Sequence, residues 1–183
     1  MSLIRNRLAW GVLMLSCIYI ASGCGYTTQA VLPEDIKTIH VEVFRNNIDI
    51  TKEVSAKDKY EVYRPNLEVD IRDAIISRIF LDGNFKIASG KAADAVLTGE
   101  ILHYRKDPLR YQNDDVTEYR ITLVCDFRLK TTLGSKILLK ESKITGDTTY
   151  FTTGSLQASE TSALEAAMND LAKNIIDKLV ENW

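Results

Sequence analysis

The apolar residues are arranged first as one continuous run and then, farther along the chain, at regular strand or helix spacing. The continuous run covers 8–20, and its 13 residues are too few to span a bilayer, which needs about 20. Arg5 and Arg7 precede it, and small residues follow at 21–23. A positive start, a short apolar run and small residues at its end predict a lipoprotein-type signal peptide over residues 1–23.

The small residues lead directly into Cys24, an arrangement that resembles a bacterial lipobox with Ala21 where Leu is more usual. The resemblance implies acylation of Cys24 (with palmitate among the chains), cleavage before it, and anchoring by two or more acyl chains. Gly25 is not Asp, which by resemblance to lipoprotein sorting favours the outer membrane. The alternative is an ordinary secretory signal cut near Gly23, with Cys24 a bystander.

Alternation of period two predicts the strands. We expect them at 36–44, 85–88, 95–105, 116–131 and 137–150. In the longest of these, the apolar positions share one face and the other face is mostly polar. The apolar positions are Tyr119, Ile121, Leu123, Cys125, Phe127 and Leu129.

Two details of the strands depend on single residues. In the first strand, Ile39, Val41 and Val43 are expected to lie on one face. Pro108 has no backbone N–H and cannot donate to a neighbouring strand, so we expect pairing to stop before it. Residues 106–115 are then predicted to be a polar turn.

Apolar spacing of three and four predicts helices over 65–81 and 159–182. Gly83 follows the first helix and suits a left-handed C-terminal stop. The second helix would begin with a capping box at Ser162 or, alternatively, at Ser159. The expected buried stripes are Leu67, Ile71, Ala74, Ile75 and Ile79 in the first helix, and Leu164, Ala167, Met168, Leu171, Ile175 and Leu179 in the second.

Together these elements predict an α+β fold, with a roughly four-stranded mixed or antiparallel sheet and two helices packed on one face. We expect a single domain over 36–183, preceded by an acylated tether over 24–35, with 47–64 as a charged surface loop. The second sheet face would stay open, and it would carry Arg120, Thr122, Asp126 and Arg128.

Charge and composition disfavour two kinds of function, nucleic-acid binding and metal or cofactor binding. Without Arg5 and Arg7 the chain has 21 basic and 25 acidic residues, which makes nucleic acid a poor partner. His40 and His103 lie in separate strands, so we expect no metal and no cofactor. Cys125 lies in a strand pattern and is expected to be a buried thiol.

No catalytic motif is present in the sequence, so we expect a protein that is not an enzyme. Asp114 and Asp115 are adjacent carboxylates, but neighbours on a loop usually point apart and stay solvated. Basic residues are the better candidates for ligand contact, because Arg binds phosphate through bidentate hydrogen bonds and Lys binds it as a point charge. The candidates are Arg105, Lys106, Arg110, Lys140 and Lys143, which could also be solvated charges that protect a sheet edge.

Short motifs along the mature chain resemble the LptE family of lipopolysaccharide-assembly lipoproteins. In chain order they are Cys24-Gly25-Tyr26, Leu32-Pro33, Phe44-Arg45-Asn46, Pro65-x-Leu67-Glu68, Ala93-Asp94-Ala95-Val96-Leu97-x-Gly99, Val116-Thr117-Glu118-Tyr119, Asp170-Leu171-Ala172 and Leu179-Val180-Glu181-Asn182-Trp183. The chain departs from the family between Thr51 and Arg64, where it is longer and more charged.

The resemblance implies a non-enzymatic outer-membrane lipoprotein of the periplasmic side. Such a protein lies in the lumen of the large β-barrel LptD, as its plug and assembly partner, and binds lipopolysaccharide on its way to the outer leaflet. Because Arg105, Lys106 and Arg110 cluster in the sequence, our hypothesis is that they contact lipid A or core phosphates, with Lys140 and Lys143 as further candidates for lipopolysaccharide contact. Two alternatives remain open: a lipoprotein that serves another envelope machine, such as a secretin pilot or a cell-wall synthase activator, and a periplasmic enzyme.

Overall fold

The computed structural model describes residues 36–48, 60–61, 64–133 and 136–181. The signal peptide, the tether and Cys24 lie outside these residues, as does most of the charged loop at 49–59. The elements are β1 (Thr38–Val41), β2 (Arg45–Asn46), β3 (Tyr60–Glu61), α2 (Leu67–Asp82), β4 (Lys86–Ile87), the 3₁₀ turn η1 (Gly90–Ala92), β5 (Ala95–Gln112), β6 (Asp115–Thr131), β7 (Ile137–Phe151) and α3 (Glu160–Glu181).

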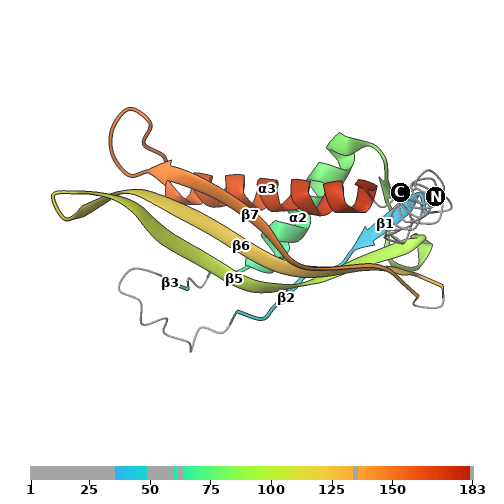
Figure 1. Ribbon diagram of the computed structural model, residues 1–183. Coiled ribbons are helices and arrows are strands. Elements are labelled where there is room, and N and C mark those ends of the chain that lie inside the picture. Colours follow the sequence, from blue (N-terminus) through green and yellow to red (C-terminus); the bar gives the residue numbers. More distant parts are fainter. Residues whose placement is uncertain (1–35, 49–59, 62–63, 134–135, 182–183) are drawn as a thin grey trace, which may run out of the picture.

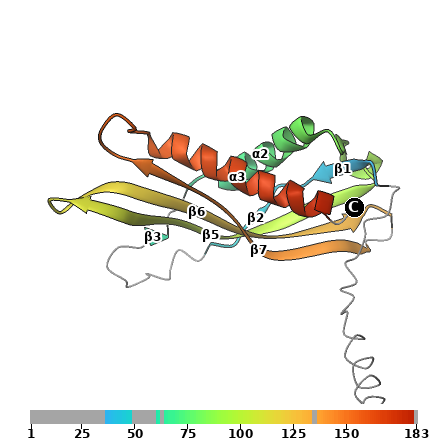
Figure 2. The same ribbon diagram turned by 45° about the horizontal axis from the view of Figure 1, so that its top comes forward.

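Seven strands among the described residues form one mixed sheet. Five of them follow the order β4-β1-β5-β6-β7, and the other two, β2 and β3, each pair with β5. Strands β5, β6 and β7 form a long antiparallel meander, and β1 pairs with β4 and β5 in parallel. Beyond β1, the outer edge of β5 is paired by β2 and then by β3. Both helices lie on the same face of the sheet (Figure 1, Figure 2). The predicted α+β class is therefore confirmed, and the sheet exceeds four strands because of three two-residue strands.

The prediction that β5 would end before Pro108 is wrong. The strand continues to Gln112, and Pro108 pairs with Tyr119 of β6. Register shifts on either side of Arg110 show how the strand tolerates a proline, since an irregular pairing absorbs the missing N–H. The turn is only Asn113 and Asp114, both with positive φ, which suits a tight hairpin and residue types that adopt the left-handed region.

The first strand is also shorter than predicted. It ends at Val41, and the alternation is lost there, so that Val43 is exposed while Phe44 is buried. The buried Phe44 ring lies against Gly99 of β5, where any side chain would overlap the ring. Val41 pairs with Leu97 and Arg45 with Glu100, so this segment has one residue more than the matching part of β5. Phe44, and not Val43, therefore faces the core.

The two helices confirm the predicted stripes and correct their starts. Pro65 lies in the turn before α2, which begins after Asn66, and Gly83 ends the helix with φ 78° and an N–H that donates to the Ile79 carbonyl at 3.1 Å. The N–H of Ser162 donates to the Ser159 Oγ at 3.1 Å, so Ser159 caps α3 and the alternative start is correct.

Helix α3 packs closely along β7. Gly146 permits this approach, because a Cβ there would overlap the backbone of Ala167 and Leu171. Side chains of α3 also satisfy the free edge of β7: the Asn174 amide donates to the Thr145 carbonyl at 2.8 Å, and Asp170 accepts from the Asp147 N–H at 3.1 Å. The helix thus buries one face of the strand and blocks part of its edge from pairing with another strand.

Candidate functional site

The β5–β6 hairpin projects past the start of α3 and forms one end of the molecule, which we call the hairpin end (Figure 1, Figure 2). Large apolar side chains are exposed there: Leu109 and Tyr111 on β5, and Leu156 in the segment before α3. Arg110 lies between the first two and is 67% exposed. The hairpin end thus combines apolar side chains with an accessible cation.

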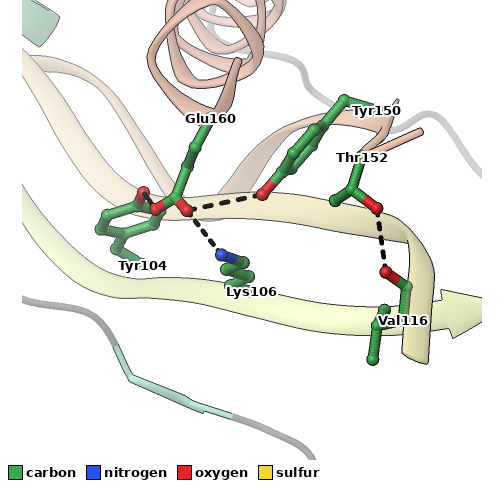
Figure 3. Close-up of polar contacts among 6 residues, drawn as sticks. All are labelled: Tyr104, Lys106, Val116, Tyr150, Thr152 and Glu160. Carbon is green, nitrogen blue, oxygen red and sulfur yellow. Dashed lines mark hydrogen bonds and ion pairs between the residues drawn. The ribbon is translucent and has the colours of Figure 1, made fainter. Parts of the chain in front are cut away.

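Behind the hairpin end, Glu160 at the first turn of α3 holds a polar cluster against the sheet (Figure 3). Its carboxylate accepts from Lys106 Nζ at 2.5 Å and from the hydroxyls of Tyr104 and Tyr150, each at 3.4 Å. Lys106 Nζ also lies 4.4 Å from the centre of the Tyr119 ring. The cluster joins α3 to β5, β6 and β7.

Burial and charge tune the protonation of this cluster. Burial, followed by the Glu160 charge, raises the pKa of Tyr104 to about 12. Burial alone would lower the pKa of Lys106, but the hydrogen bonds to Glu160 and Tyr150 outweigh it and raise that pKa above its ordinary value. Lys106 is therefore a charged partner of Glu160 at neutral pH.

The structure does not bring Arg105, Lys106 and Arg110 together on one face. Lys106 faces the helices, whereas Arg105 pairs with Thr122 and Arg110 with Glu118, which places both arginines on the open face. Arg110 Nε lies 3.4 Å from Glu118 Oε2, and its guanidinium lies 5.9 Å from the Phe151 ring.

Two side-chain atoms of β5 lack a hydrogen-bond partner among the described residues. They are Arg105 Nε and Asp107 Oδ1, and both are buried. The same holds for Arg78 Nε and Thr132 Oγ1 in other parts of the described chain.

The other two candidates lie apart from the hairpin end. Lys140 is exposed on the open face and pairs with Arg128 of β6. Lys143 has φ 57° at a bulge in β7, where its N–H donates to Asp126 Oδ1 at 2.8 Å, and its side chain lines a shallow surface hollow beside the second half of α3. The five predicted residues thus occupy four separate places: Lys106 on the helix face, Arg105 and Arg110 on the open face of the hairpin end, Lys140 elsewhere on that face, and Lys143 at the bulge in β7.

The open face carries a shallow hollow of about 160 Å³ near the middle of the sheet. Charges of both signs line it, and Arg128 Nη2 lies 3.4 Å from Glu100 Oε1. A similar pair joins Arg120 to Asp147 at 3.7 Å. The open face thus carries paired charges of both signs around this hollow and along β6, whereas Thr122 and Val124 on the same face are buried.

Cys125 is fully buried in β6, as predicted, and burial raises the pKa of its thiol to about 12. Within the described ranges, no group of three or more His, Cys, Asp or Glu side chains could hold a metal ion. Across the same residues, neither helix is long and apolar enough to cross a membrane.

A family model described as "LptE: Lipopolysaccharide-assembly" matches residues 36–182. The chain belongs to the LptE family. The match includes every element of the sheet and both helices, so the hairpin end and the Glu160 cluster are features of an LptE-family domain. This confirms the family resemblance predicted from the short motifs. The search of curated proteins finds no match.

Among solved structures, this LptE-family chain is similar to hypothetical protein CT253 from Chlamydia trachomatis, with 12% identity, a TM-score of 0.48, and coverage of 79% of this chain and 95% of that chain. It is also similar to the rare lipoprotein B from Shewanella oneidensis, with 15% identity, a TM-score of 0.43, and coverage of 78% of this chain and 94% of that chain. A third similar structure is lipoprotein GNA1162 from Neisseria meningitidis, with 11% identity, a TM-score of 0.41, and coverage of 79% of this chain and 99% of that chain.

Sequence reasoning missed Glu160 and the stacked rings of Tyr119 and Tyr150, whose centroids are 5.8 Å apart. These residues are distant in the sequence from Lys106, and only the antiparallel register brings them together. One signal was available in the sequence. Successive side chains of a strand point to opposite faces, so Arg105 and Lys106 lie on different faces if the strand continues past residue 105.

Proposed function

We propose that this LptE-family protein is an outer-membrane lipoprotein, acylated at Cys24, that plugs an LptD-like β-barrel and binds lipopolysaccharide for delivery to the outer leaflet. The observation that carries the proposal is the family match over residues 36–182. A lipid tether at 24–35 would hold the domain on the periplasmic side, from which it enters the barrel lumen.

The open sheet face supports the plug role. The interior of an outer-membrane barrel is polar, whereas its outer surface is apolar. A face with balanced charge pairs, such as Arg128 with Glu100 and Arg120 with Asp147, suits a polar lumen better than it suits lipid. The helices, by contrast, use their apolar stripes to fill the protein's own core.

The hairpin end supports lipopolysaccharide binding. Lipopolysaccharide presents phosphates next to acyl chains, and the hairpin end presents Arg110 next to Leu109 and Tyr111. Arg105 lies on the same face, and its positive charge could supply a second attraction to a phosphate. Lys106 is bound to Glu160, so its contribution would be to position the strand or to switch partners on binding.

We expect the double variant Arg105→Glu and Arg110→Glu to weaken lipopolysaccharide binding at least about tenfold, because each charge-assisted phosphate contact contributes roughly 1.5–3 kcal/mol. Binding of radiolabelled lipopolysaccharide to the purified full chain measures this. Arg72→Glu with Lys173→Glu is the matched control, since both residues are cations on the helices and the net charge change is equal.

Equal binding by the hairpin variant and the control would remove the assignment of the ligand site. The family membership would be unaffected. Lys140→Glu and Lys143→Glu, tested singly, decide whether the two candidates outside the hairpin end also contribute.

A further inference from the structure

One row of paired residues at the hairpin end runs through three strands. Arg110 of β5 pairs with Glu118 of β6, and Glu118 pairs in turn with Phe151 of β7. Residues that lie directly opposite one another on neighbouring strands present their side chains on the same face of the sheet. The three side chains therefore form a line on the open face, with the carboxylate between the cation and the ring.

The Arg110 side chain extends along this row. Its Nε lies 3.4 Å from Glu118 Oε2, and its guanidinium carbon lies 5.9 Å from the centre of the Phe151 ring. The side chain of Glu118 is 14% exposed, whereas that of Arg110 is 67% exposed. A mostly covered carboxylate thus lies beneath a cation that solvent or a ligand can reach.

The backbone of Arg110 is held as well. The pairing of β5 with β6 is irregular on both sides of this residue, first after Pro108 and again before Tyr111. The Thr117 hydroxyl donates a hydrogen bond to the Arg110 carbonyl at 3.4 Å. Such irregular pairings change the direction in which a side chain leaves the strand. The fold itself therefore sets where the guanidinium lies.

The arrangement suits a phosphate group. The ion pair with Glu118 uses Nε, the inner nitrogen of the guanidinium, and its two terminal nitrogens can still form the parallel pair of hydrogen bonds with which Arg binds phosphate. Lys has no such fork and binds phosphate only as a point charge. A side chain that is held before the ligand arrives also loses less entropy on binding.

We propose that Glu118 and Phe151 are positioning residues, which hold the Arg110 guanidinium so that its terminal nitrogens bind a phosphate group of an amphiphile in bidentate geometry. The inference rests on the proposed lipopolysaccharide site and states how that site recognises a phosphate ester. Leu109 and Tyr111, the exposed neighbours of Arg110, contact the apolar part of the same ligand.

The charge of Glu118 lets the sign of one effect test the proposal. If Glu118 acted through its charge alone, Glu118→Gln would remove a repulsion and tighten the binding of a phosphate. A positioning role predicts the opposite. We expect Glu118→Gln and Phe151→Leu each to weaken binding about threefold, which is the order of an exposed ion pair or cation–π contact. Arg110→Lys should weaken it at least as much, because the fork is lost.

The experiment measures binding of radiolabelled lipopolysaccharide to the purified full chain in detergent, with dephosphorylated lipopolysaccharide as the second ligand. The losses should appear with the phosphorylated ligand only. Adding Glu118→Gln to Arg110→Lys should cause no further loss, since both act through one contact. Asp147→Asn is the matched control: it neutralises the partner of Arg120 on the same face and should change binding by less than about twofold.

Unchanged or tighter binding by Glu118→Gln, together with a loss in Arg110→Lys, would overturn the positioning role and leave the ligand site intact. Should Glu118→Gln not fold, Phe151→Leu decides in the same way, because it changes no charge. Unchanged binding by Arg110→Lys would contradict both the ligand site and this inference. Displacement of the ligand by an equal concentration of inorganic phosphate would show a site for a free anion and would also overturn it.

Discussion

At the residue scale, Glu160 joins the first turn of α3 to the sheet through an ion pair with Lys106. Its partner Lys106 is 23% exposed in its side chain, whereas Glu160 is 42% exposed. Removing the carboxylate charge leaves a largely buried ammonium without its counter-charge, which costs more than the loss of a surface ion pair.

We therefore expect Glu160→Gln to lower the free energy of unfolding by about 1 kcal/mol, after allowance for the solvent that screens the exposed part of the pair. Chemical denaturation of the full chain in detergent measures this. Glu165→Gln is the matched control, because Glu165 is exposed on the same helix. An equal effect of the two variants would show that the cluster in Figure 3 does not stabilise the fold.

Asp94 is the residue whose ionisation should matter in acid. Hydrogen bonds from the Thr38 hydroxyl and from the N–H groups of Thr38 and Lys37 hold the pKa of Asp94 below its ordinary value of 3.8. A lowered carboxyl pKa contributes stability that is present above the unfolded-state value and is lost as the pH falls through the folded-state value.

The difference in melting temperature between the wild type and Asp94→Asn should thus be largest above pH 4 and should shrink as the pH falls below 3.8. Thermal melts from neutral pH down to about pH 3 measure it. A difference that stays constant across this range would mean that the ionised form of Asp94 has no special role at the start of β1.

At the element scale, the close packing of α3 on β7 depends on a residue without a side chain. In Gly146→Ala, the new Cβ would overlap backbone atoms of Leu171 and Ala167, which cannot move as a flexible side chain could. We expect a loss of about 3 kcal/mol in the free energy of unfolding, at the upper end for overpacked sites.

Thr149→Ala is the control for this substitution, since Thr149 is exposed on the same strand, and it should change the free energy of unfolding by less than about 0.5 kcal/mol. If Gly146→Ala were as mild, helix α3 would have to be able to shift away from β7. Amide exchange at the Asn174 and Asp170 contacts would detect such a shift.

The elements that the sequence predicted best are those with long, regular apolar spacing. Strand β6 and helix α3 have nearly the predicted bounds, because each buries one complete face. Strands β2 and β3 have two residues each, so no spacing could reveal them. The predicted strand at 95–105 is shorter than β5, because the missing N–H of Pro108 suggested that pairing would stop there. The sequence does not reveal the irregular pairing that accommodates this proline.

The candidate site was predictable only in part. Composition and motif could select basic residues near position 105, but the faces on which they lie follow from the true length of β5. Glu160 could not be paired with Lys106 from the sequence, because 54 residues and two strands separate them. Phe80 and Leu81 lie outside the apolar stripe predicted for the first helix, and both are exposed.

At the scale of the whole molecule, an elongated sheet carries different chemistry at its two ends and on its two faces. Helices α2 and α3 cover one face of the sheet (Figure 2), and the other face carries charged pairs such as Arg128 with Glu100. One end has an accessible arginine among apolar side chains, and the other has two exposed apolar side chains, Phe80 and Leu81, in the last turn of α2.

The central claim is that the acylated protein is the partner of a large outer-membrane β-barrel. It is tested most directly by purifying the tagged full chain from outer membranes in detergent and identifying the bound proteins by mass, with a tagged Cys24→Ala chain as the control. The account predicts an LptD-like barrel in equal amount that stays bound in strong detergent. A different dominant partner, such as a secretin or a cell-wall synthase, or no partner at all, would contradict it.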